Sequence, residues 1–163
     1  MSTPSQEAIV AGAAENKFKG TPIKRGDSFA VLPFVVLSTD VRFHQLSQGF
    51  SENLTYHLVK NQVVKVIERT QLDKAVKEMS LSMTGAVDDS TAQSIGKIVG
   101  AMYVIIGSVE ILEDHVEINC RVLQVQTSEN ILVEKVSGTI DQIFSLRDQL
   151  GERISQQIAM SVK

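Results

Sequence analysis

"MYVIIGSVEILEDHVEINCRVLQV", residues 102–125, predicts two strands joined by a tight turn at Glu113 and Asp114. The first of these strands, residues 102–112, starts apolar on both faces, as strands covered on both sides do. The second, residues 115–125, alternates between apolar and polar side chains, which is typical of a strand with one buried face. Its inward positions are Val116, Ile118, Cys120 and Val122.

Further strands flank this hairpin on both sides. Residues 131–140 follow a turn at residues 127–130, so we expect a meander of three strands at the C-terminal end of the sheet. Towards the N-terminus, "SFAVLPFVVL", residues 28–37, is β-branched and apolar on both faces and predicts a central strand. Pro33 inside it indicates a bulge, or a point where the hydrogen-bond ladder ends.

An amphipathic helix is predicted over residues 41–60. Asp40, with the preceding Ser and Thr, supplies side chains suited to the helix N-cap, and Asn61 is a plausible C-cap. The apolar stripe consists of Phe43, Leu46, Phe50, Leu54 and Leu58.

The segment "VVKVIERTQLDKAVKEM", residues 63–79, predicts a short strand followed by a second helix. Thr70 and Asp73 have the spacing of a capping box at the helix start. Glu68 and Arg69 fit an ion pair at the strand end. A catalytic carboxylate is the alternative, but it needs a positioned partner, and no nucleophile lies nearby in the sequence. The buried stripe is predicted to be Leu72, Ala75, Val76 and Met79.

Two more helices complete the pattern. After a loop at residues 81–87, Asp89 or Ser90 is expected to cap a helix that Gly100 closes. Its apolar side chains are Ala92, Ile95, Ile98 and Val99. Asp141 is expected to cap the long last helix, whose stripe is Ile143, Leu146, Leu150, Ile154 and Ile158. The fold class is therefore α+β, in the order β-α-β-α-α-β-β-β-α, with helices packed on a mixed five-stranded sheet.

Composition narrows the classes of function. The 163-residue chain carries a formal net charge of -3 and no Trp, which is unlike a nucleic-acid-binding surface. A single cysteine, Cys120, excludes an internal disulfide and a multi-cysteine metal site. No stretch approaches the roughly 18 consecutive apolar residues of a transmembrane helix. Residues 1–27 are small, polar and poorly periodic, so we expect a flexible leader before a single domain at residues 28–163.

Four segments stand in the order seen in a bacterial envelope superfamily: "AVLPF" (30–34), "VIERTQLDKAVKE" (66–78), "AQSIGKIVGAMYVIIGSV" (92–109) and "IFSLRDQLGERI" (143–154). The chain resembles the CsgG-like curli secretion channel proteins and their relatives. Those are the FlgO-like lipoproteins, the LpoB-type activators of penicillin-binding proteins and the TolB N-terminal domain. The resemblance covers roughly residues 28–162, which is nearly all of the predicted folded part.

The resemblance rests most on a glutamate-arginine pair at a strand end and on the glycine-bounded run at residues 100–109. The family-motif positions, which we interpret as structural, are Glu68, Arg69, Thr70, Asp73, Gly100, Tyr103, Gly107 and Ser108. The resemblance implies a non-enzymatic domain that works by protein contact in the periplasm. It also implies a lipoprotein anchored to the outer membrane, although the leader lacks the Cys that such an anchor needs.

No catalytic, metal or cofactor site is predicted. His44, His57 and His115 are too far apart in the sequence to suggest one metal ion, and Cys120 is expected to be a buried small hydrophobe. Ser108 lacks the pattern of a nucleophile elbow.

The favoured function is an accessory domain of a secretion, flagellar or cell-wall machine, whose partner is another envelope protein or a second copy. Nucleic acid is not an expected partner, and membrane contact is expected only through an anchor outside this sequence. One alternative is a small-molecule or nucleotide-binding regulatory domain, with its site at the strand ends near residues 37–40 and 68–70. The other is a ring-forming subunit of a curli-type channel, although the turns at residues 113–114 and 127–130 are short for a pore.

Overall fold

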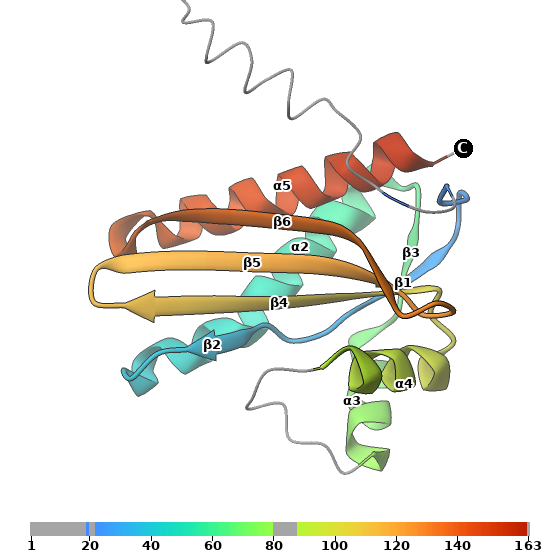
Figure 1. Ribbon diagram of the computed structural model, residues 1–163, viewed down its shortest axis with the longest axis horizontal. Helices are drawn as coiled ribbons and strands as arrows, with labels where there is room; N and C mark the ends of the chain where they lie inside the picture. Colours follow the sequence, from blue (N-terminus) through green and yellow to red (C-terminus); the bar gives the residue numbers. More distant parts are fainter. Residues whose placement is uncertain (1–18, 20–21, 80–87, 163) are drawn as a thin grey trace, which may run out of the picture.

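The computed structural model describes residues 19, 22–79 and 88–162 (Figure 1). Its strands are β1 (Ser28–Val31), β2 (Val35–Leu37), β3 (Lys65–Val66), β4 (Tyr103–Leu112), β5 (His115–Gln124) and β6 (Glu129–Thr139). Its helices are η1 (Val41–Gln45), α2 (Leu46–Asn61), α3 (Arg69–Glu78), α4 (Asp89–Val99), η2 (Ile140–Gln142) and α5 (Ile143–Ser161). The predicted α+β class and the order of elements are confirmed.

The sheet runs in the order β3-β1-β4-β5-β6, and β2 pairs with β4 beyond the end of β1. Strands β1, β2, β3 and β4 are parallel, and β4, β5 and β6 form the predicted antiparallel meander. The sheet has six strands where the sequence predicted five, because the expected first strand is broken in two at Pro33. Val31 pairs with Ile105 and Val35 with Ser108, so the chain makes a one-residue bulge around a residue that has no N–H to donate.

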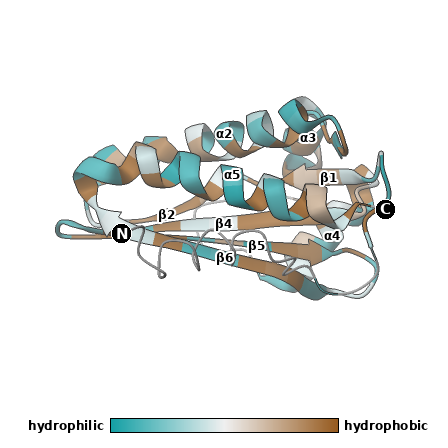
Figure 2. Ribbon diagram, turned by 90° about the horizontal axis from the view of Figure 1, so that it is seen from above, coloured by the Kyte–Doolittle hydropathy of each residue, from teal (hydrophilic) through white to brown (hydrophobic). Residues whose placement is uncertain are grey.

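The two faces of the sheet are covered unequally (Figures 1 and 2). Helices α2 and α5 lie along one face and bury the larger cluster of apolar side chains, which includes Phe50, Leu54 and Ile154. Helix α4, with α3 beside it, closes a smaller cluster around Val104, Ile106 and Leu123 on the opposite face. The remainder of that second face has no helix from the described residues over it.

The first helix begins as a 3-10 turn, and the cap predicted at Asp40 is confirmed. The Asp40 carboxylate accepts a hydrogen bond from the Arg42 backbone N–H at 3.0 Å and from the Arg42 guanidinium at 2.6 Å. These hydrogen bonds lower the pKa of Asp40 to about 2. At the other end the prediction of Asn61 as the cap was wrong. Gln62 takes the left-handed conformation there, with φ 57, while Asn61 turns towards Ser155 on α5.

The predicted N-caps of the last two helices lie one or two residues from the observed ones. Asp88, not Asp89 or Ser90, accepts from the Thr91 backbone N–H at 2.7 Å and caps α4. Asp89 instead forms an ion pair with Arg121 at 2.9 Å. The last helix is preceded by a capping box between Thr139 and Gln142, so Asp141 was the wrong cap. Ile98, one of the apolar side chains of the predicted helix that forms α4, is 51% exposed.

The fold includes residues that the sequence assigned to the leader. Ile23 is fully buried and forms a parallel bridge with Val162, and the Lys19 backbone N–H donates to the Ile131 carbonyl at 2.8 Å. The predicted domain start at residue 28 is therefore too late for Ile23, which stands alone in a polar segment and gives no periodic signal. The rest of the predicted leader, residues 1–18 and 20–21, and the predicted loop at 81–87 lie outside the described residues.

Candidate functional site

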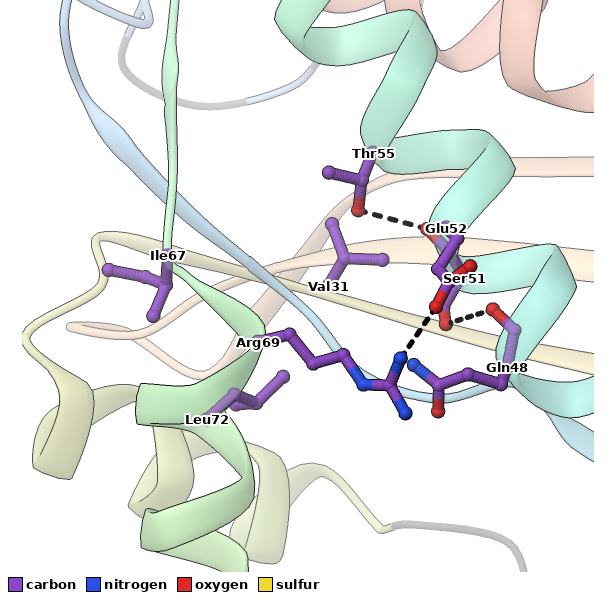
Figure 3. Close-up of a pocket in the computed structure, with 8 residues that line it drawn as sticks. All are labelled: Val31, Gln48, Ser51, Glu52, Thr55, Ile67, Arg69 and Leu72. Atoms are coloured by element: carbon purple, nitrogen blue, oxygen red, sulfur yellow. Dashed lines mark hydrogen bonds and ion pairs between the residues drawn. The ribbon is translucent and has the colours of Figure 1, made fainter.

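A hollow lies between α2 and α3, where the sequence predicted a small-molecule site (Figure 3). Its volume is about 130 Å³. It is lined by Val31, Gln48, Ser51, Glu52, Thr55, Ile67, Arg69 and Leu72. Of the two segments of the predicted site, residues 68–70 contribute Arg69 to this lining. Residues 37–40 do not line the hollow, because β2 pairs further along β4 and they follow it there.

Among the described residues, Arg69 is the one cation that lines this hollow, and acidic side chains already bind it. Its Nη1 lies 2.6 Å from Glu52 Oε1 on α2, and its Nε lies 3.6 Å from Asp73 Oδ2 one turn along α3. With its amide oxygen turned towards the guanidinium, Gln48 accepts from Arg69 Nε at 2.9 Å. Arg69 therefore joins α2 to α3 and is not left free for an anionic ligand.

The small volume of the hollow also argues against a ligand site. Pockets that hold cofactors or drug-sized ligands commonly measure about 300–1,000 Å³. The side chains of Arg69 and Glu52 are more than half exposed, so water screens their attraction. The arrangement is that of a contact between two helices.

The start of α3 differs from the predicted capping box. Glu68 occupies the N-cap position without a side-chain hydrogen bond to the helix, and Thr70 is exposed within the first turn. Within the described residues, Asp73 and Glu52 are the ionic partners of Arg69, so the predicted pair of Glu68 with Arg69 is not formed. Of the two residues of the glutamate-arginine motif, Arg69 is therefore the one that forms ion pairs among the described residues.

The glycine-bounded motif builds the centre of the sheet. Gly100 ends α4 in the left-handed conformation, with φ 73, as predicted. Tyr103 is 2% exposed and stacks on Phe29 with ring centroids 4.7 Å apart. Burial, and secondarily the charge of Asp27, raises the pKa of Tyr103. Gly100 therefore sets the end of α4, whereas Tyr103 contributes to the packing of the core.

Gly107 and Ser108 face opposite sides of β4. Gly107 leaves room for the ring of Phe34 on the covered face. Ser108 points to the open face and lines a depression of about 150 Å³ together with Asn119, Arg121 and Val133. The motif thus reaches the part of the sheet that the described helices leave uncovered.

We define the open face as the outward side chains of β4, β5 and β6 beyond α4: Ser108, Glu110, Leu112, Glu117, Asn119, Val133 and Lys135. Two apolar side chains stand well out of it, Leu112 at 69% and Val133 at 61% exposure. Between them Lys135 Nζ lies 3.9 Å from Glu117 Oε2. The open face therefore carries two separate exposed apolar side chains with one ion pair between them.

Sequence reasoning did not identify this surface, although it predicted the outward polar positions of β5. The sequence did contain one signal of this surface: in the alternation of β4 and β6, Leu112 and Val133 are apolar side chains at positions that turn out to be exposed. The strand pattern by itself does not show where α4 stops covering the sheet, because that depends on the packing of α4 against β4 and β5.

Other candidate chemistry is sparse in the described residues. They include no group of three or more His, Cys, Asp or Glu side chains placed to hold a metal ion. Cys120 is 2% exposed, as predicted, and burial raises the pKa of its thiol. Across residues 19, 22–79 and 88–162, no helix is long and apolar enough to cross a bilayer.

Residues 28–114, from β1 to the turn after β4, match the family model described as "Curli production assembly/transport component CsgG". The chain belongs to the CsgG family. This confirms the resemblance read from the two motifs, both of which lie inside the matched region. No curated protein sequence matched the chain.

Solved structures share the fold of this CsgG-family chain. The LpoB C-terminal domain from Salmonella enterica is 22% identical, with TM-score 0.59 over 71% of this chain and 84% of that one. A PelC dodecamer subunit from Paraburkholderia phytofirmans is 13% identical, with TM-score 0.54 over 89% and 94%. A lipoprotein from Neisseria meningitidis is 16% identical, with TM-score 0.58 over 82% and 97%.

Proposed function

We propose that this CsgG-family chain is a non-enzymatic interaction domain of the bacterial cell envelope, an accessory to a secretion, flagellar or cell-wall machine. The family model is named for curli production, assembly and transport, and one structural relative is a lipoprotein from Neisseria meningitidis. We further propose that residues 28–163, together with the buried Ile23, act as one domain and that the residues before it tether this domain. We also propose that the full-length protein is anchored in the outer membrane and faces the periplasm.

The open face is the observation that carries this proposal. Nearly all of the second face of β4, β5 and β6 beyond α4 is free of described helices, and it presents Leu112 and Val133 to solvent. Exposing these side chains costs hydrophobic free energy, which a docked protein would recover by covering them. The paired Glu117 and Lys135 between them would set the orientation of a partner more than its affinity.

The chemistry of the described residues supports a binding role. A nucleophile or general base needs a hydrogen-bonded partner in a polarised cleft. Cys120 is buried with a raised pKa, and the hollow at Arg69 is occupied by neutralising side chains. The open face offers contact area instead.

A photo-crosslinking side chain at position 133 tests the proposal in cells that produce the full-length protein. Position 56 on α2 is the matched control, because Tyr56 and Val133 are 59% and 61% exposed on opposite sides of the sheet. We expect one crosslinked envelope protein, identified by mass spectrometry, from position 133 and none from position 56. Equal products from both positions, or none from position 133, would exclude the open face as the docking surface.

A ring-forming subunit is the second candidate, favoured by the likeness to a protein solved as a dodecamer. Light scattering coupled to gel filtration separates the two candidates. A mass near that of the single 17.9 kDa chain supports an adaptor that docks a different protein. A closed assembly of many copies supports the ring, and crosslinks from position 133 would then join identical chains.

A regulatory domain for a small anion or nucleotide finds little support in the hollow at Arg69. Thermal unfolding across a panel of nucleotides and inorganic anions tests it, because a ligand that binds the folded state raises the unfolding temperature. We expect no shift. A shift that Arg69→Gln abolishes would revive this alternative.

A further inference from the structure

One end of the molecule gathers most of the exposed cations of the described chain. This basic end consists of residues 19, 22–28, 60–65, 97–102 and 125–129. It carries Lys19, Lys24, Arg25, Lys60, Lys65 and Lys97, all exposed. Against these six cations, the same described segments contain two carboxylates, Asp27 and Glu129.

Backbone hydrogen bonds hold these segments together. Gly26 donates to Val63 and Lys65 donates to Asp27, each at 2.9 Å, which places Lys24, Arg25 and Lys65 around one corner. On the adjacent segment, Met102 donates to the Ser28 carbonyl at 3.0 Å, and its side chain is 48% exposed. The cations and an exposed apolar side chain therefore lie on neighbouring segments, and at the edge of the basic end Lys60 lines a hollow together with Glu152 of α5.

The opposite end has the reverse charge. This acidic tip consists of residues 37–42, 110–117 and 139–142, which the pairing of Leu37 with Glu110 and a bond from Ile140 to the Asp114 carbonyl bring together. It carries Asp40, Glu110, Glu113, Asp114, Glu117 and Asp141. Arg42 is the one arginine or lysine of these segments.

The two ends are far enough apart to act separately. Strand β4 runs between them over ten residues. At about 3.4 Å per residue the separation is on the order of 30 Å, several times the Debye length of about 8 Å at physiological salt. Although the net charge is only -3, positive and negative side chains are therefore separated towards opposite ends of the molecule.

We propose that the basic end binds an anionic lipid surface and orients the domain with its acidic tip pointing away. An anionic bilayer attracts dispersed lysines and arginines near its surface and repels carboxylates, so one orientation is favoured. Both ends of the fold, at Ile23 and Val162, lie side by side at this end (Figure 1). The inference goes beyond the proposed function because it concerns a membrane surface and leaves the open face free for a protein.

Co-sedimentation of the purified chain with phosphatidylcholine vesicles, with and without phosphatidylglycerol, tests the proposal. We expect partitioning only onto the anionic vesicles, and loss of it at high salt. The double variant Lys24→Gln/Arg25→Gln should bind these vesicles more weakly, by roughly tenfold or more. The matched control, Arg42→Gln/Lys135→Gln, removes the same two charges away from the basic end and should bind within about twofold of the unmodified chain.

Orientation gives a second readout. A fluorophore on Met102→Cys should be quenched by a lipid-borne quencher, whereas one on Leu112→Cys should not, and the buried Cys120 leaves the labels selective. Equal effects of the two double variants, equal quenching at both positions, or binding that ignores salt would overturn the proposal. So would equally tight binding to soluble polyglutamate, because the basic end would then recognise any polyanion.

Discussion

The ring of Phe34 lies directly against the backbone of Gly107, so that a Cβ atom at position 107 would stand 2.4 Å from two of its carbons. Phe34 follows the break at Pro33 and packs between β4 and Phe50 of α2, with ring centroids 5.9 Å apart. The break in the first strand, the motif glycine and the covering helix therefore form one packing unit.

Gly107→Ala should destabilise the fold by about 1–3 kcal/mol, because the new methyl group has to displace a buried aromatic ring. Chemical denaturation measures the loss. Gly49→Ala is the matched control, since no described atom outside the surrounding backbone of α2 lies within 4 Å of a Cβ there. Alanine favours the helix, so a gain of up to about 1 kcal/mol is expected. A smaller loss for Gly107→Ala in a Phe34→Leu background would identify the ring as the cause.

Ile23→Ala should cost about 2–5 kcal/mol, since Ile23 is fully buried in the larger core cluster. Ile98→Ala, at a 51% exposed position, should cost less than about 1 kcal/mol. Urea unfolding of both variants gives the comparison. Equal losses would mean that Ile23 does not belong to the core in solution.

Arg69→Gln and Glu52→Gln should each reduce stability by about 1 kcal/mol or less, because the pair is exposed to water. A double-mutant cycle of Arg69→Gln and Glu52→Gln measures the coupling free energy between the two side chains. The exposed pair of Arg42 and Asp40 is left unchanged in every variant. The coupling should fall as salt is added. A coupling of several kcal/mol that resists salt would show that the contact between α2 and α3 is shielded from solvent.

Asp88→Ala should destabilise α4 at neutral pH and progressively less in acid. The hydrogen bond from Thr91 lowers the pKa of Asp88 below its ordinary 3.8 in the folded state. The stabilisation is therefore complete above that ordinary pKa and is lost as the pH falls through the lower folded pKa. Thermal unfolding between neutral and acidic pH measures it. Thr70→Ala, which removes a side chain that makes no cap, should show no such pH dependence.

Much of the fold was predictable because its signals are local. The alternation of Val116, Ile118, Cys120 and Val122, and the stripe along α5, arise within a few residues of each other, and all of these positions are buried as predicted. Helix ends were less predictable. Asp88 and Asp89 are neighbours of the same type, and only the tertiary structure shows that Asp88 caps α4 while Asp89 pairs with the distant Arg121.

The candidate site was predictable only in part. The sequence identified Arg69 as a motif residue, but its partner Glu52 comes from another helix 17 positions away. Ser108 was singled out as a poor nucleophile, and only the pairing of β4, β5 and β6 shows that it lies on an open face with Val133. Contacts of this kind leave no periodic trace in one sequence.

By itself, the sequence determined the α+β class, the order of the elements and the apolar side that each helix and strand buries, because hydrophobic periodicity acts over three or four residues. Tertiary structure alone decided where the helices stop covering the sheet, which partner Arg69 takes and how Ile23 joins the core. It also sorted the charges into a basic end and an acidic tip. Those features depend on which distant segments meet, and that follows from packing the whole chain around one sheet.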